Sequence, residues 1–185
     1  EFLREGSAIN DFMRPDRVVI GIDNARSKEI LQKLYNPLFL IETPIVFVNI
    51  ESSELIKYAS NAFLALKVSF MNQMADLCEK TGGDVQELAK GLGLDKRIGN
   101  KFLNVGPGYG GSCFPKDTKA LSQTAHEAGT SCSLVDAVIT YNEQRKVAMA
   151  GRIVSAISKH QYFPKKVSIL GITFKPNTDD LRDAP

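Results

Sequence analysis

The chain has 185 residues, of which 43% are apolar and 24% charged, proportions that are ordinary for a soluble globular protein. This composition excludes a disordered tail, a collagen-like fibre and a disulfide-stapled miniprotein. The length allows one domain, or one domain with part of another. The formal net charge of +2 is too small to favour nucleic acid or an anionic membrane as a partner.

The sequence contains three cysteines, Cys78, Cys113 and Cys132. Their spacing fits neither a disulfide framework nor a zinc site, and free thiols suit a reducing compartment. No segment resembles a secretory signal peptide. Lys57 and Lys67 interrupt the most apolar stretch, residues 55–77, and argue against a membrane span. We therefore expect a cytoplasmic protein with no metal site and no membrane partner.

The first fifty residues have the pattern of an α/β sheet. Residues 18–21 and 45–49 are rich in β-branched side chains and predict two strands. Between them, the apolar spacing over residues 24–34 predicts a helix that ends before Pro37. The order is therefore β-α-β, which is typical of an α/β domain.

A long helix is predicted next, over residues 52–81, because nothing breaks it before Gly82 and Gly83. It would be about 45 Å long at 1.5 Å per residue. Apolar side chains cover most of its circumference, and such a helix must be buried on several sides. We therefore expect a homodimer that packs along residues 52–81.

The rest of the chain predicts more helix and then a strand. The expected elements, in order, are a short helix from a cap at Asp84 to about residue 93, a glycine-rich loop over 96–111, a helix from Pro115 to about Ala128, a helix from a cap at Ser133 to about His160, and a strand over 166–171. The predicted fold class is mixed and mainly α, with domains at 1–50, 51–160 and 161–185.

The loop around Cys113 is the most informative segment. Its glycines at 106, 108 and 111 formally match GxGxxG, but no strand precedes them, so they favour a loop that lets backbone approach a ligand. Cys113 comes just before the helix begun by Pro115, and Lys116 adds a nearby positive charge. A helix N-terminus and a cation both stabilise a thiolate. Cys113 is therefore a candidate nucleophile, whereas Cys78 and Cys132 are expected to be small core residues.

Lys57 and Asn61 are four residues apart and project from one face of the predicted long helix. A lysine in apolar surroundings can exchange protons, and an amide can donate to an oxyanion. The alternative is a solvated stripe. We expect Lys67 and Asn72 to be solvated or at an interface, and His126 and His160 to lie on the surface. Acid–base chemistry would then fall to a short list of groups, Lys57, Asp117, Glu1 and Glu5.

The sequence resembles the UDP-glucose/GDP-mannose dehydrogenase family in four blocks. They are EFLREG at 1–6 with PDRV at 15–18, ELIKYASNAF at 54–63, GGSCFPKD at 110–117 and GITFKPNTDD at 171–180. Their order and spacing match along nearly the whole chain. The resemblance implies an oxidoreductase that converts UDP-glucose to UDP-glucuronate with two NAD⁺, through a thiohemiacetal and a thioester on cysteine.

The resemblance also implies roles for individual residues. The catalytic set would be Cys113, Lys57, Asp117, Asn61 and Glu1. The substrate set would be Phe2, Leu3, Lys57, Asn61, Arg97, Phe102, Leu103, Asn104, Val105, Gly106, Gly110, Phe174 and Lys175. The NAD set would be Glu5, Cys113, Lys116 and Arg182. No metal is implied.

The fold that the resemblance implies is an all-helical central dimerisation domain, similar to the C-terminal domain of 6-phosphogluconate dehydrogenase, between pieces of two Rossmann-like domains. We expect a fragment of a longer chain, inactive on its own, in which the N-terminal NAD fingerprint is absent. Two alternatives within the family are oxidation of GDP-mannose or of a UDP-N-acetylhexosamine. A non-enzymatic helical dimerisation module is the second class, and a nucleic-acid binder has little support.

Overall fold

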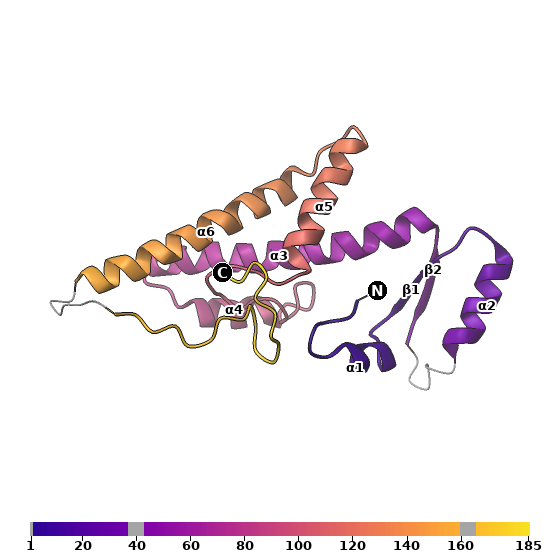
Figure 1. Ribbon diagram of the computed structural model, residues 1–185, viewed down its shortest axis with the longest axis horizontal. Coiled ribbons are helices and arrows are strands. Elements are labelled where there is room, and N and C mark those ends of the chain that lie inside the picture. The colour runs from indigo at the N-terminus through magenta and orange to yellow at the C-terminus, as the bar shows by residue number, and fades with distance from the viewer. Residues whose placement is uncertain (1, 37–42, 160–165) are drawn as a thin grey trace. The chain divides into compact units, whose positions relative to one another are not determined.

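The computed structural model describes residues 2–36, 43–159 and 166–185, and this part of the chain is mainly helical with few strands (Figure 1). It separates into two compact units, Glu1–Ser60 and Asn61–Pro185. The division falls inside helix α3 (Ile50–Thr81). The domain boundaries predicted after residues 50 and 160 stay predictions. Among the described residues, no helix combines the length and the hydropathy that a membrane crossing requires.

The first unit is built around a parallel pair of strands. Its elements before α3 are α1 (Ala8–Met13), β1 (Val18–Gly21), α2 (Ala25–Tyr35) and β2 (Ile45–Val48). In the β-sheet, Val18 lies opposite Ile45 and the register continues to Gly21 opposite Val48. The side chain of Asn24 accepts a hydrogen bond from the Ser27 N–H at 2.8 Å and so begins α2. The predicted β-α-β order is confirmed.

Helix α1 was not predicted, because polar contacts and not an apolar stripe hold it. The guanidinium of Arg4 donates to both carboxylate oxygens of Asp11, and the Arg4 N–H donates to the same side chain at 2.8 Å. These hydrogen bonds from Arg4 lower the pKa of Asp11 to about 2. Such a contact leaves no periodic signal in the sequence.

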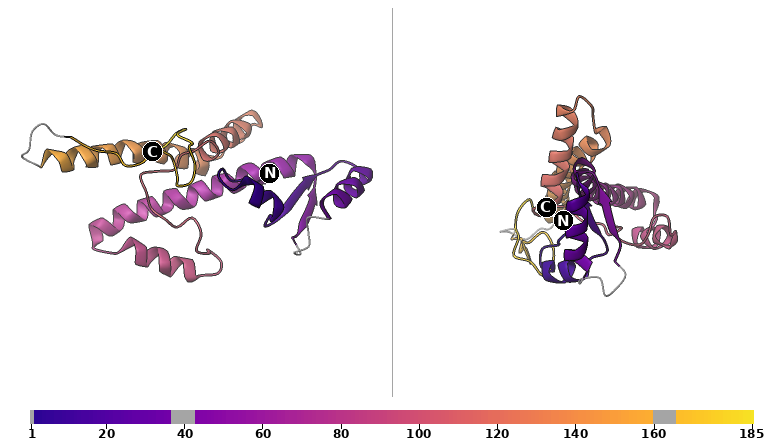
Figure 2. Two further views of the ribbon diagram at one scale, coloured as in Figure 1. Left: turned by 60° about the horizontal axis from the view of Figure 1, so that its bottom comes forward. Right: turned by 90° about the vertical axis from the view of Figure 1, so that its right-hand side faces the viewer.

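The long helix α3 begins at Ile50, two residues before the predicted start, because the side chain of Asn49 accepts the Ser52 N–H at 2.9 Å. It ends at Thr81, and Gly82 follows with a φ of +80°. The chain then reverses into α4 (Val85–Leu94) (Figure 2). The Asp84 side chain accepts from two N–H groups of α4, which confirms the predicted cap.

The last two helices, α5 (Phe114–Glu127) and α6 (Ser133–Ser158), pack against each other. Pro115 lies in the first turn of α5, as predicted. The predicted Ser133 cap is wrong, because Ser133 is the first helical residue and Cys132 precedes it without a side-chain cap hydrogen bond. His160 lies outside the described residues.

The strand predicted over residues 166–171 is also wrong. This segment has no regular structure, and Ile169 and Leu170 are 76% and 96% exposed. A strand is held by hydrogen bonds to a neighbouring strand. Among the described residues, β1 and β2 pair with each other in the first unit, and neither pairs with this segment. The β-branched composition of residues 166–171 is therefore not enough to form a strand here.

The core of the second unit includes a residue of the glycine-rich loop. Ala65, Tyr109 and Val138 are buried together, with Phe114 packed against them. The Tyr109 and Phe114 rings meet edge to face, with centroids 6.1 Å apart. Burial raises the pKa of the Tyr109 hydroxyl. The loop is thus fixed to α3 and α6 immediately before the residue singled out as a nucleophile.

Candidate active site

Cys113 occupies the N-cap position of α5, where it is half-buried and its thiol is free. Its carbonyl accepts the Asp117 N–H at 2.8 Å, so the first turn of the helix forms directly after it. The hydroxyl oxygen of Ser112 lies 3.7 Å from the Cys113 sulfur. Cys113 therefore lies at the start of α5, where the sequence placed it, and a helix N-terminus favours an anion.

One turn further along α5, Asp117 forms a buried polar contact with α3. Its carboxylate is 1% exposed and accepts a hydrogen bond from Nδ2 of Asn61 at 2.5 Å. Nζ of Lys116 lies 2.9 Å from the other carboxylate oxygen. An amide, a carboxylate and an ammonium group therefore meet beside the turn that carries Cys113. The sequence analysis named all of these residues but did not predict that Asn61 and Asp117 touch.

Two buried amide side chains hold the loop that leads to Cys113. Oδ1 of Asn72 accepts the Gly106 N–H at 2.8 Å. Asn142 accepts the Tyr109 N–H at 2.8 Å and donates to the Tyr109 carbonyl at 3.0 Å. Asn72 is 1% exposed, so its interpretation as a solvated or interface residue is wrong. It is buried because it accepts the Gly106 N–H, which has no partner in a helix or strand and would otherwise be left without a hydrogen bond.

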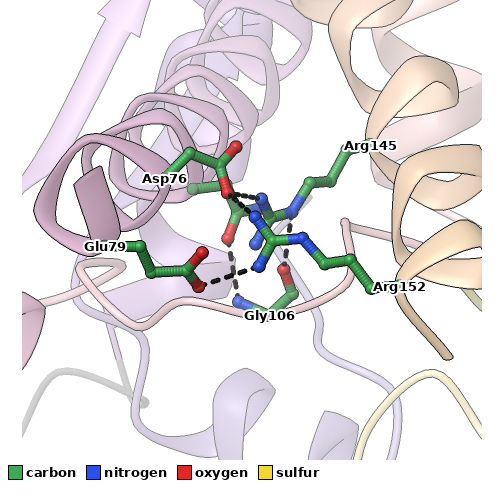
Figure 3. Close-up of polar contacts among 6 residues, drawn as sticks. Asp76, Glu79, Gly106, Arg145 and Arg152 are labelled. Carbon is green, nitrogen blue, oxygen red and sulfur yellow. Dashed lines mark hydrogen bonds and ion pairs between the residues drawn. The ribbon is translucent and has the colours of Figure 1, made fainter. Parts of the chain in front are cut away.

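A network of ion pairs between α3 and α6 also contacts this loop, through Arg145. Figure 3 shows the carboxylate of Asp76 of α3 facing the guanidinium groups of Arg145 and Arg152 of α6, and its Oδ1 lies 2.5 and 2.7 Å from their nitrogens. Arg145 also donates to the Gly106 carbonyl at 3.2 Å, and Arg152 contacts Glu79 at 2.8 Å. Arg145 is 6% exposed, and the nearby Asp76 carboxylate offsets the burial of its charge. The sequence analysis gave no role to the four charged residues, because charged residues scattered along two helices carry no local signal.

The segment after residue 173 lies against the cysteine turn. Asp180, which is 5% exposed, accepts the Ser112 N–H at 3.2 Å. The carbonyl of Arg182 accepts the Gly111 N–H at 2.8 Å. The Arg182 guanidinium in turn donates to Asp180 at 2.7 Å. Asp180 belongs to a block that carried the resemblance, but no role was expected for it.

Replacing Gly111 with alanine is expected to cost about 1–3 kcal/mol of stability. Gly111 has a φ of +84°, and a Cβ there would come within 2.6 Å of the Phe174 ring. Thermal unfolding of the full-length protein measures the loss. Gly151→Ala is the matched control, because this helical glycine faces open space and alanine there favours the helix. Equal melting temperatures for the two variants would contradict the packing described here.

In the first unit, two cationic side chains lie near the ring of Phe2, a predicted substrate residue. The Arg17 guanidinium lies 4.0 Å from the centroid of Phe2, and Nζ of Lys57 lies 5.7 Å from it. Leu3 and Glu5 are half-buried in the same unit. Glu1 lies outside the described residues. Lys57 and Asn61 belong to different units, although both are part of α3.

The remaining predicted residues of the second unit lie in the loops. Phe102 has a φ of +63°, a strained conformation for a residue with a side chain, and Leu103 is buried. Arg97 is exposed and paired with Asp95 at 2.6 Å. Nζ of Lys175 lies 5.2 Å from the Phe174 ring centroid. Asn104 is exposed, Val105 is half-buried and Gly110 is buried.

Several residues were expected to have no catalytic role, and their burial mostly agrees with that expectation. Cys78 is buried and Cys132 is half-buried, and neither is disulfide-bonded. His126 is exposed. Nζ of Lys67 donates to the Ile98 carbonyl at 3.0 Å, so this lysine ties α3 to the following loop.

Two family models match the chain. The central domain of the UDP-glucose/GDP-mannose dehydrogenase family matches residues 51–144, and the NAD binding domain of the same family matches residues 1–39. Two similar proteins are the UDP-glucose 6-dehydrogenase of Rhizobium meliloti, 56% identical, and the UDP-glucose 6-dehydrogenase TuaD of Bacillus subtilis, 48% identical. All of this chain aligns with each of them, but it spans only 43% and 39% of their lengths.

Two solved structures are also similar to this chain over its whole length. A UDP-glucose dehydrogenase from Pyrobaculum islandicum superposes with a TM-score of 0.85 at 39% identity, over 100% of this chain and 41% of that one. A UDP-D-ManNAc dehydrogenase from Pyrococcus horikoshii superposes with a TM-score of 0.81 at 25% identity, over 100% of this chain and 43% of that one.

Proposed function

This chain belongs to the UDP-glucose/GDP-mannose dehydrogenase family, and on that premise we propose that it is the nucleophile-bearing middle of an NAD-dependent UDP-glucose 6-dehydrogenase. The observation that carries the proposal is the cysteine turn. Cys113 begins α5 next to the Ser112 hydroxyl, and one turn later Asp117 is held by Asn61. The match to the family's NAD binding domain supports NAD as the cofactor.

The proposed reaction removes four electrons from the 6-hydroxymethyl group in two hydride transfers. NAD⁺, when bound, accepts one hydride in each of them. The alcohol first becomes an aldehyde, and the Cys113 thiolate adds to its carbonyl carbon to give a thiohemiacetal. Loss of the second hydride leaves a thioester. Water then adds to the carbonyl carbon of the thioester, the bond to the Cys113 sulfur breaks, and the uronate is released while Cys113 regains its thiolate.

Several side chains would move protons or hold charge during these steps. The Asn61 amide and the Lys57 ammonium would donate to the oxyanion, and Asp117 would exchange protons with the bound water or hydroxyl. The contact between Asn61 and Asp117 supports a shared role, because it fixes both side chains in a buried position. Glu1 is proposed for thioester hydrolysis on the family pattern alone.

The substrate and cofactor contacts are proposed from the family pattern. The UDP-sugar would bind the loop over residues 102–106, together with Gly110 and Lys175, and Arg97 would reach the neighbouring subunit. A diphosphate needs backbone N–H groups and cations, which this set can supply. Glu5, Lys116 and Arg182 would contact NAD.

We further propose the finer fold, with a helical central domain between parts of two Rossmann-like domains and a homodimer formed along α3. Phe63, Phe70 and Leu77 support the dimer, because they are 62%, 46% and 53% exposed on one helix. They recur every seven residues, which places them on one face. Large exposed apolar side chains in a row mark an interaction surface.

Replacing Phe70 with glutamate is expected to shift the full-length protein from dimer toward monomer. The charge would be buried in the proposed interface without a partner. Light scattering after size-exclusion chromatography measures the mass. Lys80→Glu, an exposed change near the end of the same helix, is the control. A Phe70→Glu protein that keeps the mass of the parent at micromolar concentration would contradict the α3 interface.

The substrate is tested by initial rates of the full-length protein on UDP-glucose, GDP-mannose and a UDP-N-acetylhexosamine. We expect the highest kcat/KM with UDP-glucose, since the similar curated proteins carry that name. A higher value with either of the other two sugars would assign the chain to a different branch of the family. No oxidation of any of them would contradict a dehydrogenase.

The 185 residues alone are expected to produce no NADH from UDP-glucose and NAD⁺. They contain the proposed nucleophile, but the family's NAD binding domain matches only residues 1–39, and the chain spans about two fifths of the similar enzymes. Absorbance at the NADH band checks this, with the full-length protein as the positive control. Turnover by the short chain would refute the prediction that the 185 residues are inactive alone.

The alternative is a non-enzymatic helical module. It would be favoured if iodoacetamide modified Cys113 no faster than Cys78.

A further inference from the structure

The geometry points to Asp180 as a positioning residue for the turn that carries Cys113, an inference that rests on the proposed function. Asp180 lies far from Cys113 in sequence, on the segment that follows the predicted central domain. Its carboxylate is 5% exposed and accepts the N–H of Ser112, the residue directly before the nucleophile, at 3.2 Å. A buried carboxylate on a backbone N–H fixes that peptide in one orientation.

Asp180 also controls the preceding peptide through Arg182. Its Oδ1 accepts the Arg182 N–H at 2.9 Å and Nε at 2.7 Å, and its Oδ2 accepts Nη2 at 3.1 Å. The carbonyl of Arg182 in turn accepts the Gly111 N–H at 2.8 Å. Asp180 therefore holds the Gly111–Ser112 peptide directly, and the main chain of Arg182 holds the Gly110–Gly111 peptide.

Asp180 is itself held firmly enough to act in this way. Its N–H donates to the Thr178 hydroxyl at 3.1 Å, and its carbonyl accepts the Phe174 N–H at 3.1 Å. The Arg182 guanidinium compensates the buried negative charge, so the carboxylate can lie near a thiolate without a net repulsive charge.

The glycines before Cys113 make its position depend on these contacts. Gly110 and Gly111 give this turn more freedom than other residues would, and Asp180 removes that freedom at the Gly111–Ser112 peptide, one peptide before Cys113. With the Ser112 peptide fixed, the Ser112 hydroxyl stays near the Cys113 sulfur and the sulfur stays at the N-terminus of α5. A misplacement of about 1 Å of a reacting group can cost about 100-fold in rate.

The test uses the full-length protein and three variants. Asp180→Asn keeps the shape but removes the charge, Asp180→Glu moves the carboxylate by one methylene, and Asp179→Asn is an exposed neighbour as control. We expect Asp180→Asn to lower kcat by about 10- to 100-fold with a smaller change in the KM for UDP-glucose. Asp180→Glu should recover part of the loss, and Asp179→Asn should match the parent.

A second readout separates positioning from simple charge effects. The rate of Cys113 alkylation by iodoacetamide is measured against pH without NAD or substrate. Positioning predicts that the midpoint moves to higher pH in Asp180→Asn, because the sulfur loses its fixed place at the helix N-terminus. A midpoint that moves to lower pH would mean that Asp180 acts only as a nearby negative charge, and would overturn the inference.

Amide hydrogen exchange of the parent protein keeps the inference testable if the variants do not fold. The Ser112 N–H should exchange far more slowly than the N–H groups of exposed loops, and unprotected exchange would overturn the inference. Its failure is distinct from failure of the proposed function. Full activity of Cys113→Ser would refute the function, whereas an inactive Cys113→Ser with a parent-like Asp180→Asn would refute only the role of Asp180.

Discussion

Full-length protein with Cys113 replaced by serine is expected to form UDP-glucuronate at least about 1000-fold more slowly than the parent. A serine hydroxyl at the start of α5 is far less ionised than a thiol, so it cannot add to the aldehyde at a comparable rate. It also gives an ester in place of a thioester, which water cleaves more slowly. Chromatography with mass detection, after incubation with UDP-glucose and NAD⁺, measures the uronate.

Cys132→Ser is the matched control for this change. Cys132 is also half-buried and also precedes a helix, α6, but it has no role in the proposed reaction. It should keep the parental rate. Full uronate formation by Cys113→Ser would refute the assignment of the nucleophile, however well the remaining residues fit the family.

Replacing Asn61 with aspartate is expected to destabilise the protein by about 2 kcal/mol or more at pH 7. The new carboxylate would lie at the position from which Nδ2 now donates to Asp117 at 2.5 Å. Two buried carboxylates at that distance cannot both stay ionised, so one is held as the acid. Its titration point is raised in the folded state, and the variant therefore keeps most of its stability at low pH and loses it as the pH rises.

Thermal unfolding of the Asn61→Asp variant between pH 5 and pH 8 measures this dependence. Asn100→Asp, an exposed substitution of the same kind, should melt like the parent across the range. A melting temperature of the Asn61→Asp variant that does not fall relative to the parent toward pH 8 would contradict the contact. The oxidation rate should fall too, because the amide donor proposed for the oxyanion is lost.

Local signals predicted much of the helical fold. Pro115 at the start of α5, Gly82 after α3 and the Asp84 cap of α4 each act within a few residues of the element that they define. The same local signals failed where long-range pairing decides. Residues 166–171 have strand composition, but a strand also needs a neighbour.

The candidate site was predictable in its members and not in its contacts. Cys113 stood out because glycines, a proline and a lysine surround it. The contact between Asn61 and Asp117 joins residues 56 apart, and that between Ser112 and Asp180 joins residues 68 apart. Asn72 was misinterpreted for the same reason, since its backbone partner Gly106 lies on a distant loop. Buried polar residues are decided by such partners, which the sequence does not place.

The central claim is that Cys113 forms a covalent bond to the oxidised sugar, and an acid-quenched reaction tests it most directly. Full-length protein is mixed with UDP-glucose and NAD⁺, stopped within one turnover, digested and examined by mass spectrometry. We predict an acyl adduct with the mass of the UDP-glucuronyl group on the peptide that contains Cys113, and unmodified peptides for Cys78 and Cys132. Turnover without an adduct on Cys113, or with an adduct on another cysteine, would contradict the account.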